Sequence, residues 1–352
     1  MTHATTPPIF DGHNDLLLRL LGGAVTASGV ANGLGSGHID LPRAQRGGFG
    51  GGFFAIFVPS PAKPGDDLDA MSRPQYDLPL PEMIPQPEAL ETTWRGVEAF
   101  EALAAAGAIT PCTTVAEIGA ALGGPKMAGV LHLEGAEAIG PDLEELHALY
   151  ARGLRSLGPV WSRPTIFGNG VPFRYPSTPD TGDGLTEAGK RLVKECNALK
   201  VMIDLSHLNE KGMDDVAALS DAPLVATHSN AHAVTTHARN LTDRQLAMIA
   251  ESDGMVGINF ATAFLREDGR MGSDCGLDVV LHHLDHLIGK LGEDRVGFGS
   301  DFDGATVPEG IADVAGLPNL RAALTAHGVD AALMEKLCHG NWLRVLRKTW
   351  GA

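Results

Sequence analysis

Cysteine is scarce in this chain and is not arranged as a disulfide framework. The 352 residues include four cysteines, at positions 112, 196, 275 and 338, and no two of them form a C-x-x-C pair. A small secreted scaffold stapled by disulfides would have more cysteines at closer spacing. The spacing excludes that class of protein and predicts reduced thiols.

Long hydrophobic runs are also missing. Residues 1–10 carry neither a basic region nor an apolar stretch of signal-peptide length. The run at residues 16–21 is interrupted by Arg19 and is far shorter than the ~20 apolar residues that span a bilayer. Residues 342–352 lack the hydrophobic tail of a lipid-anchor signal. We therefore expect a soluble, cytoplasmic protein without membrane attachment.

Basic residues are fewer than acidic ones: the chain has 27 Lys and Arg residues and 43 Asp and Glu residues, which give a net charge of −16. Such a chain repels phosphate backbones, so nucleic acid is not an expected partner. Hydrophobic residues make up 44% of the sequence, which is enough to bury a large core and argues against disorder.

Eight short segments have the character of strands buried on both faces, because they are mostly continuously apolar rather than alternating. They are residues 9–13, 53–58, 128–133, 154–158, 201–205, 224–227, 255–260 and 296–299. Helix-like segments lie between most of them, for example at residues 87–106, 186–199 and 277–291. Eight strand–helix repeats predict an α/β fold of the TIM-like (β/α)8 barrel type and disfavour the competing doubly wound open sheet.

The segments outside this pattern predict the remaining organisation. Residues 59–87 and 163–184 exceed ordinary loop length, and loops of this size commonly carry function. Residues 331–346 have the pattern of a closing helix after the eighth strand. We find no internal repeat or linker, so residues 1–352 are expected to form a single metal-dependent hydrolase barrel domain.

Metal-capable side chains follow several of the predicted strands. His13 and Asp15 end the first strand, Glu134 follows the third, and His207 and His228 follow the fifth and sixth. Residues two apart in an extended chain point the same way, so the first pair can grip one cation. The strand ends of a barrel share one rim, which brings the five side chains together. Imidazole and carboxylate ligands in this number predict a site for two divalent metal ions, with Zn²⁺ favoured.

Other candidate motifs are weaker. His282, His283 and His286 lie on one amphipathic helix without an accompanying carboxylate motif, so a structural role is favoured for them. His132 lies two residues before Glu134 and fits either the barrel interior or a supporting position near a metal. The sequence has no G-x-S-x-G motif, and the glycines at 47–52 precede a strand, which is the wrong order for a phosphate cradle.

The metal-capable residues belong to a series of motifs that resembles the membrane dipeptidase (renal dipeptidase) family, a branch of the amidohydrolase barrels. The motifs are DGHND at 11–15, EG at 134–135, DLSH at 204–207, THSNA at 227–231, ARN at 238–240, GSDFDG at 299–304 and VPEGIAD at 307–313. They occur in the same order over nearly the whole chain, which makes the resemblance specific.

The resemblance implies roles for the matching residues. His13 and Asp15 would hold one zinc ion, His207 and His228 the other, and Glu134 would bridge both.

Two more positions acquire roles in the same way. Arg239 would bind the C-terminal carboxylate of a dipeptide, to which its planar guanidinium is suited. Asp301 would contact the substrate amino group and transfer protons. Animal members carry a histidine after the fourth strand where Trp161 stands here, so contacts to the scissile carbonyl differ on that side.

The expected reaction is hydrolysis of free dipeptides, L-Xaa-Xaa, by a hydroxide that bridges the two metal ions; whether a D-residue is accepted at the C-terminal position is left open. The alternatives are another amidohydrolase-type activity on N-acyl amino acids, cyclic amides or lactones, and a non-enzymatic metal-binding barrel.

The long loop after the fourth strand supplies further candidates. Trp161, Arg163, Phe167, Asn169 and Phe173 either line the substrate cleft or pack the loop onto the barrel, with Trp161 and Asn169 expected to contact substrate. Residue Tyr76 in the other long loop has the same two interpretations. Family members commonly pair through such loops, so a homodimer is expected.

Overall fold

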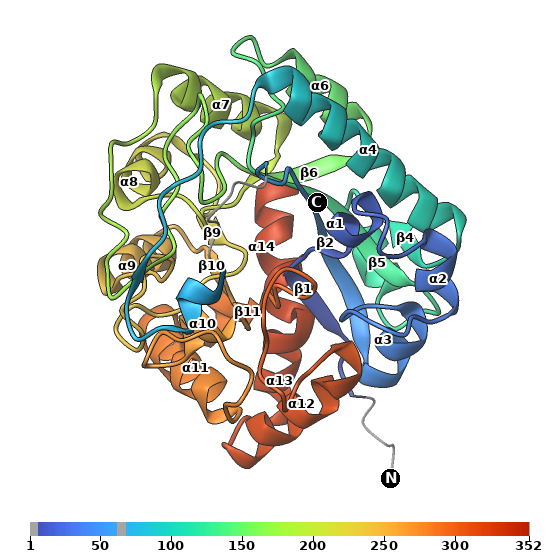
Figure 1. Cartoon of the computed structure of the whole chain (residues 1–352). Helices are drawn as coiled ribbons and strands as arrows, with labels where there is room; N and C mark the ends of the chain where they lie inside the picture. The colour runs from blue at the N-terminus through green and yellow to red at the C-terminus, as the bar shows by residue number, and fades with distance from the viewer. Residues whose placement is uncertain (1–5, 62–67, 352) are drawn as a thin grey trace.

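The computed structural model describes residues 6–61 and 68–351. Its central feature is a ring of parallel strands, viewed along its axis in Figure 1. The strands are β1 (Ile9–Asn14), β2 (Phe49–Phe57), β5 (Met127–Glu134), β6 (Leu154–Gly158), β8 (Met202–Ile203), β9 (Val225–Ala226), β10 (Met255–Ile258) and β11 (Val296–Phe298). Each of the eight predicted strands overlaps one of them.

The ring closes between β8 and β9. The other neighbours follow the order β8-β6-β5-β2-β1-β11-β10-β9. A parallel bridge between Asp204 and Val225, with a 2.9 Å hydrogen bond from the Leu205 amide to the Val225 carbonyl, joins the two ends. The predicted TIM-like barrel is confirmed, and the open doubly wound sheet is excluded.

Three short strands lie outside the ring. β4 (Ile109–Pro111) pairs with β5 and was not predicted. β3 (Tyr76–Asp77) and β7 (Arg174–Tyr175) form an antiparallel pair that joins the two long loops. The prediction treated both loops as irregular, because a two-residue strand has no periodicity to detect.

Helices surround the ring (Figure 1). Those after the second to seventh strands include α4 (Gln86–Ala105), α5 (Val115–Ala121), α6 (Glu144–Ala151), α7 (Glu187–Leu199), α8 (Glu210–Leu219), α9 (Asp243–Glu251), α10 (Thr262–Leu265) and α11 (Asp278–Leu291). Side-chain caps fix several of these starts: Thr186, Asn209 and Thr242 each accept a hydrogen bond from the backbone amide three residues on.

The long first and last connections hold shorter helices. α1 (Leu16–Leu21), α2 (Ala27–Asn32) and α3 (Leu41–Gly47) lie between β1 and β2. After β11 come η3 (Val314–Gly316) and α12 (Leu317–Ala326). Of the helices in residues 6–61 and 68–351, none is both long enough and apolar enough to cross a membrane.

The predicted closing helix exists and covers one end of the barrel. It consists of α13 (Ala331–Glu335), a π-helical turn (Lys336–Gly340) and α14 (Asn341–Trp350). The Trp342 indole packs on Phe10 and Phe53 inside the ring and donates a 3.0 Å hydrogen bond to the Phe298 carbonyl. A Cβ on Gly12 would lie 2.5 Å from this ring, so glycine is required there. This end of the barrel is therefore plugged by side chains.

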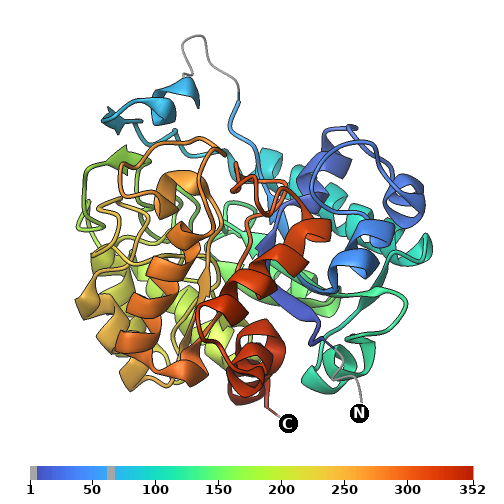
Figure 2. The same ribbon diagram turned by 90° about the horizontal axis from the view of Figure 1, so that it is seen from below.

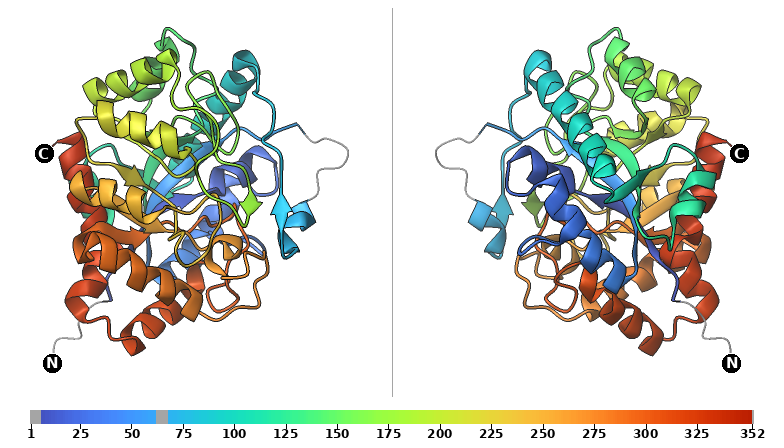
Figure 3. Two further views of the ribbon diagram at one scale, coloured as in Figure 1. Left: turned by 90° about the vertical axis from the view of Figure 1, so that its left-hand side faces the viewer. Right: turned by 90° about the vertical axis from the view of Figure 1, so that its right-hand side faces the viewer.

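The opposite end is the mouth. In Figure 2 the segment with η1 (Leu68–Ser72) and β3 lies at the far side of the barrel from α14, and Figure 3 shows it standing outside the ring of helices. The strands point their C-terminal ends toward this side, as in other barrels of the class. The predicted metal ligands thus lie at the mouth.

Candidate metal centre

Five buried side chains meet around one oxygen of Glu134. His207 Nε2 lies 2.9 Å and His228 Nε2 lies 3.5 Å from Glu134 Oε1. His13 Nε2 lies 3.6 Å from the same oxygen and 3.4 Å from Asp15 Oδ2. None of the five residues is more than 6% exposed. The structure brings together all five side chains that the sequence proposed as metal ligands.

The ligand atoms form two triads that share Glu134. His13, Asp15 and Glu134 make one triad, and Glu134, His207 and His228 make the other, with the atoms of each within 4.8 Å of one another. A carboxylate has two oxygens and can therefore serve both sets. This arrangement suits a pair of cations better than a single one.

The chemistry of the two triads fits divalent cations. Burial opposes charge on His13, yet the carboxylates of Glu134 and Asp15 raise its pKa to about 10. Among the described residues, neither ring nitrogen of His13 has a hydrogen-bond partner, and the Nε2 atoms of His207 and His228 face each other at 3.1 Å. The carboxylates thus draw positive charge to this point, which bound cations would supply in place of the proton on His13. Nitrogen and carboxylate donors of this kind suit zinc and similar metals.

A hydrogen-bond chain orients His228. The Thr227 hydroxyl donates to Asp204 Oδ2 at 2.6 Å, so it accepts from His228 Nδ1 at 2.8 Å. The proton then lies on Nδ1 and leaves the Nε2 lone pair free for a metal, as supporting residues commonly arrange. Asp204 also accepts bonds from Ser206. Its carboxylate makes a third group of possible ligand atoms with His13 and His228, but its hydrogen bonds favour a supporting role.

Asp301 stands beside the first triad in a strained backbone. Its φ is 59°, a left-handed conformation that costs a residue other than glycine about 1–3 kcal/mol. The Asp301 amide donates to the His13 carbonyl at 3.0 Å, which ties the segment to β1. A Cβ on Gly304 would lie 2.1 Å from Asp15 Oδ2 and 2.6 Å from Asp301 Oδ1, so glycine makes room for both acids.

The proton affinity of Asp301 is raised. Burial and the neighbouring carboxylate of Asp15 raise the pKa of Asp301 above its ordinary value. The Asn259 amide donates a 2.9 Å hydrogen bond to Asp301 Oδ2, which holds the carboxylate in place. A raised pKa suits a group that accepts and releases a proton near neutrality. Asn259 was not predicted as a site residue, because the seventh predicted strand extended to residue 260 and included it, whereas β10 ends at Ile258.

Arg239 is buried, 2% exposed, and is not among the described residues that line the cavity next to the triads. Its guanidinium donates to the backbone carbonyls of Ser206 and His228 and lies 5.3 Å from the centre of the Phe264 ring. Its Nε is buried without a hydrogen-bond partner among the described residues. Burial lowers the pKa of Arg239 to about 10, which still leaves it charged at neutral pH. It therefore keeps its positive charge close to Asp301 and Glu134.

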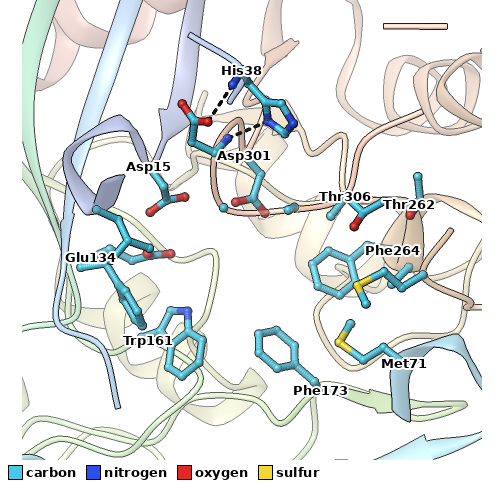
Figure 4. Close-up of a pocket in the computed structure, with 18 of the residues that line it drawn as sticks. Asp15, His38, Met71, Glu134, Trp161, Phe173, Thr262, Phe264, Asp301 and Thr306 are labelled. Carbon is cyan, nitrogen blue, oxygen red and sulfur yellow. Dashed lines mark hydrogen bonds between the residues drawn. The ribbon is translucent and has the colours of Figure 1, made fainter. Parts of the chain in front are cut away.

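A cavity of about 530 Å³ opens above the metal triads. Asp15, Glu134, His207 and Asp301 are in its lining, and Trp161 stands over His207 with ring centres 5.9 Å apart. Figure 4 shows the acids on one side and Met71, Phe173 and Phe264 on the other. The volume lies in the range of small-molecule sites.

The other loop candidates lie elsewhere. Asn169 is not among the described residues that line the cavity, and its amide donates to the Asp183 carbonyl within the same loop at 3.2 Å. The Arg163 guanidinium is fully buried against Glu137 at 2.7 Å. Phe167 is in the main core, and the Tyr76 hydroxyl donates to the Gly269 carbonyl. Arg163 and Tyr76 thus have hydrogen-bond partners within the protein and Phe167 packs in the core, which favours the packing interpretation for these three. The substrate contact predicted for Asn169 stays a prediction.

The remaining histidines also have local partners. His283 is buried and accepts a 3.0 Å hydrogen bond from the Ala231 amide through Nδ1, as its predicted structural role requires. His132 lies in the barrel interior, with Nδ1 2.9 Å from the Ser156 hydroxyl. This places His132 below the metal triads and outside both of them.

Comparison with known proteins identifies the family. The family model described as Membrane dipeptidase (Peptidase family M19) matches residues 3–350. The chain belongs to the membrane dipeptidase family. It is a metal-dependent hydrolase of the dipeptidase type, as its sequence motifs implied.

Solved structures support this membership. The chain is 60% identical to a metallopeptidase from Rhodobacter sphaeroides bound to a phosphinate mimic of the dipeptide L-Ala-D-Ala, with a TM-score of 0.95 over 98% of this chain and 100% of that one. It is also 60% identical to a metallopeptidase described as dipeptidase AC, with a TM-score of 0.96 over 99% and 100% of the two chains.

A curated relative has no assigned activity in its name. The Klebsiella pneumoniae protein described as "uncharacterized protein in pqqA 5′ region" is 47% identical over 265 residues, which are 75% of this chain and 98% of that protein. The dipeptidase assignment therefore rests on the family and on the two structures.

Proposed function

We propose that this dipeptidase uses two divalent metal ions, with Zn²⁺ the favoured metal, bound by the two triads that share Glu134. The observation that carries the proposal is the meeting of three imidazoles and two carboxylates at one buried point. When bound, such a pair of cations lowers the pKa of a water molecule and polarises the scissile carbonyl. His13 and Asp15 would hold one ion and His207 and His228 the other, with Glu134 shared between the two triads.

The substrate is a free dipeptide. Arg239 binds its C-terminal carboxylate, to which a charged, planar guanidinium is suited. Asp301 contacts its amino group from the acidic side of the cavity. A longer peptide cannot place its carboxylate at Arg239 and its amino group at Asp301 at the same time, so its affinity falls. The relative bound to an L-Ala-D-Ala mimic supports acceptance of a D-residue at the C-terminal position.

Asp301 carries out the proton transfer. Its carboxylate takes the proton of the attacking water and delivers it to the nitrogen of the departing amine. The Asn259 hydrogen bond fixes Oδ2, so the other oxygen of Asp301 handles the proton. Trp161 covers His207 and shields this side of the cavity from water. The reaction needs no protein nucleophile.

A kinetic panel tests this proposal. Purified protein with measured metal content is assayed on L,L- and L,D-dipeptides, a tripeptide, N-acyl amino acids, a cyclic amide and a lactone. We expect kcat/KM for the dipeptides to exceed that for every other class by at least tenfold. A preference for the N-acyl amino acids, cyclic amide or lactone would assign a different amidohydrolase-type reaction to the same site.

We also propose that the chain forms a homodimer through its long loops. Large apolar side chains are exposed on these loops, Met83 at 55% and Ile166 at 41%. Sedimentation at micromolar concentration tests this, and a mass of one chain would contradict it.

A further inference from the structure

One wall of the cavity is a hydrophobic cluster separate from the barrel core. Its buried members come from three segments of the chain: Ala70, Met71, Tyr76, Ala261, Ala263 and Phe264. Phe173, Tyr175 and Met271 pack against them, half-buried. The cluster thus joins η1 and β3, β7, and the segment after β10.

Hydrogen bonds fix this wall. The Met271 amide donates to the Met71 carbonyl at 2.8 Å, which joins the two methionine positions directly. The Tyr76 hydroxyl donates to the Gly269 carbonyl at 2.7 Å, and the Tyr175 hydroxyl donates to the Glu267 carbonyl at 2.6 Å. The conformation of the wall is therefore fixed by the protein's own hydrogen bonds and does not require a bound ligand.

The side chains of the wall face the cavity. Met71, Phe173, Phe264 and Met271 all line it, and the rings of Phe173 and Phe264 stack at 6.0 Å. Figure 4 shows Met71, Phe173 and Phe264 across the cavity from Asp15 and Glu134. The hydrophobic wall favours an apolar group of the substrate, and the side with Asp15 and Glu134 favours its charged amine.

The position of Arg239 decides which end of the substrate meets the wall. Its guanidinium lies 5.3 Å from the Phe264 ring, so a carboxylate bound to it lies next to this aromatic side chain. The residue that carries the carboxylate is the C-terminal one. Its side chain is then the part of the substrate nearest to Phe264.

We propose that Met71, Phe173, Phe264 and Met271 form the pocket for the side chain of the C-terminal residue, and that the two methionines set the size it accepts. This rests on the proposed dipeptidase function. Unbranched thioether side chains adapt to ligands of different shape, which fits a pocket that takes apolar residues of either configuration. Each additional buried methylene strengthens binding by about fourfold.

Two substrate series test the assignment. The series Ala-Gly, Ala-Ala, Ala-Leu and Ala-Phe varies the C-terminal side chain, and Gly-Ala, Leu-Ala and Phe-Ala vary the N-terminal one. Both are assayed with the wild type, Met71→Ala, Met271→Ala and the volume-conserving Met271→Leu. Met83→Ala, on the same long loop but exposed to solvent, is the matched control. Thermal unfolding of each variant reports on folding.

We expect each alanine variant to shift the Ala-Phe to Ala-Ala ratio of kcat/KM toward phenylalanine by about tenfold, because the enlarged pocket removes contacts from small side chains and admits large ones. The Phe-Ala to Gly-Ala ratio should stay within about twofold, and Met83→Ala should change neither ratio. Met271→Leu should alter the first ratio less than Met271→Ala does.

A change in the kcat/KM ratio confined to the substrates that vary the N-terminal residue would overturn this assignment while leaving the dipeptidase function intact. Active variants in which both ratios are unchanged would do the same. Wild-type protein that cleaves no dipeptide in either series would overturn the proposed function and the pocket assignment together.

Discussion

The side-chain amide of Asn259 donates a 2.9 Å hydrogen bond to Oδ2 of Asp301. Asn259 is itself held in place, because its backbone amide donates to Asn230 Oδ1 and its Oδ1 accepts from the Ala261 amide at 2.6 Å. The end of β10 therefore fixes the carboxylate that follows β11. Asn259 is a positioning residue in this account, and Asp301 is the group that moves the proton.

Replacing Asp301 tests the proton transfer. We expect Asp301→Ala to lower kcat by about 10²–10⁴-fold, the usual contribution of a positioned acid or base. The bound metal should be unchanged, since Asp301 belongs to neither triad. Turnover numbers and metal analysis on one preparation check this. Wild-type turnover with metal still bound would remove Asp301 from the mechanism.

Replacing Asn259 tests whether it acts through Asp301. We expect Asn259→Ala to lower kcat by about tenfold, in line with the loss of one charge-assisted hydrogen bond. In protein that already carries Asp301→Ala, the same substitution should change kcat by less than twofold, because the group it positions is gone. A further tenfold loss in the double variant would show that Asn259 has an independent role.

Arg239 should distinguish substrates by their C-terminal charge. We expect Arg239→Met to reduce kcat/KM for free dipeptides by about 10²-fold, since a buried charged hydrogen bond is lost. Hydrolysis of the same dipeptides with an amidated C-terminus should change far less. Metal content of the variant is the control, because Arg239 also bonds to the His228 carbonyl. Equal losses for both substrates would contradict carboxylate recognition.

The buried His283 should make stability depend on pH. Burial lowers the pKa of His283 from its ordinary value of 6.5 to about 4. Above pH 6.5 the ring is neutral in both states, and its contribution to stability is fully present. Between pH 6.5 and pH 4 the unfolded chain takes up a proton that the folded chain does not, so stability falls as the pH falls.

We expect the free-energy difference between wild type and His283→Gln to shrink by about 2 kcal/mol from pH 7 to pH 5. Denaturant unfolding at both pH values measures it. A difference that is constant with pH would mean that the folded protein holds His283 in its ordinary titration range.

Much of the fold and of the metal centre could be predicted from the sequence, because both depend on local patterns. Continuous apolar segments marked the strands, and the residues just after them, such as Glu134 and His228, had to meet if the strands closed a barrel. The prediction needed only the order of the strands and the direction of the chain.

The supporting interactions could not be predicted in this way. The bond between Asn259 and Asp301 and the burial of Arg163 against Glu137 depend on how loops from distant strands pack. A polar residue in a long loop has the same sequence signature whether it faces a ligand or a buried partner. Both interpretations were left open for Arg163 for this reason, and Asn169 was expected to contact substrate together with Trp161, which does line the cavity.

The central claim is that Glu134 is shared by two metal sites, both of which are needed for hydrolysis. The most direct measurement is metal content per chain, determined on the same samples whose dipeptide hydrolysis is assayed, while metal is removed with a chelator and restored stepwise with Zn²⁺. The account predicts about two ions per chain at full activity, loss of activity as they are removed, and loss of both binding and turnover in Glu134→Ala. Full activity with one ion or none, or an active Glu134→Ala variant, would contradict it.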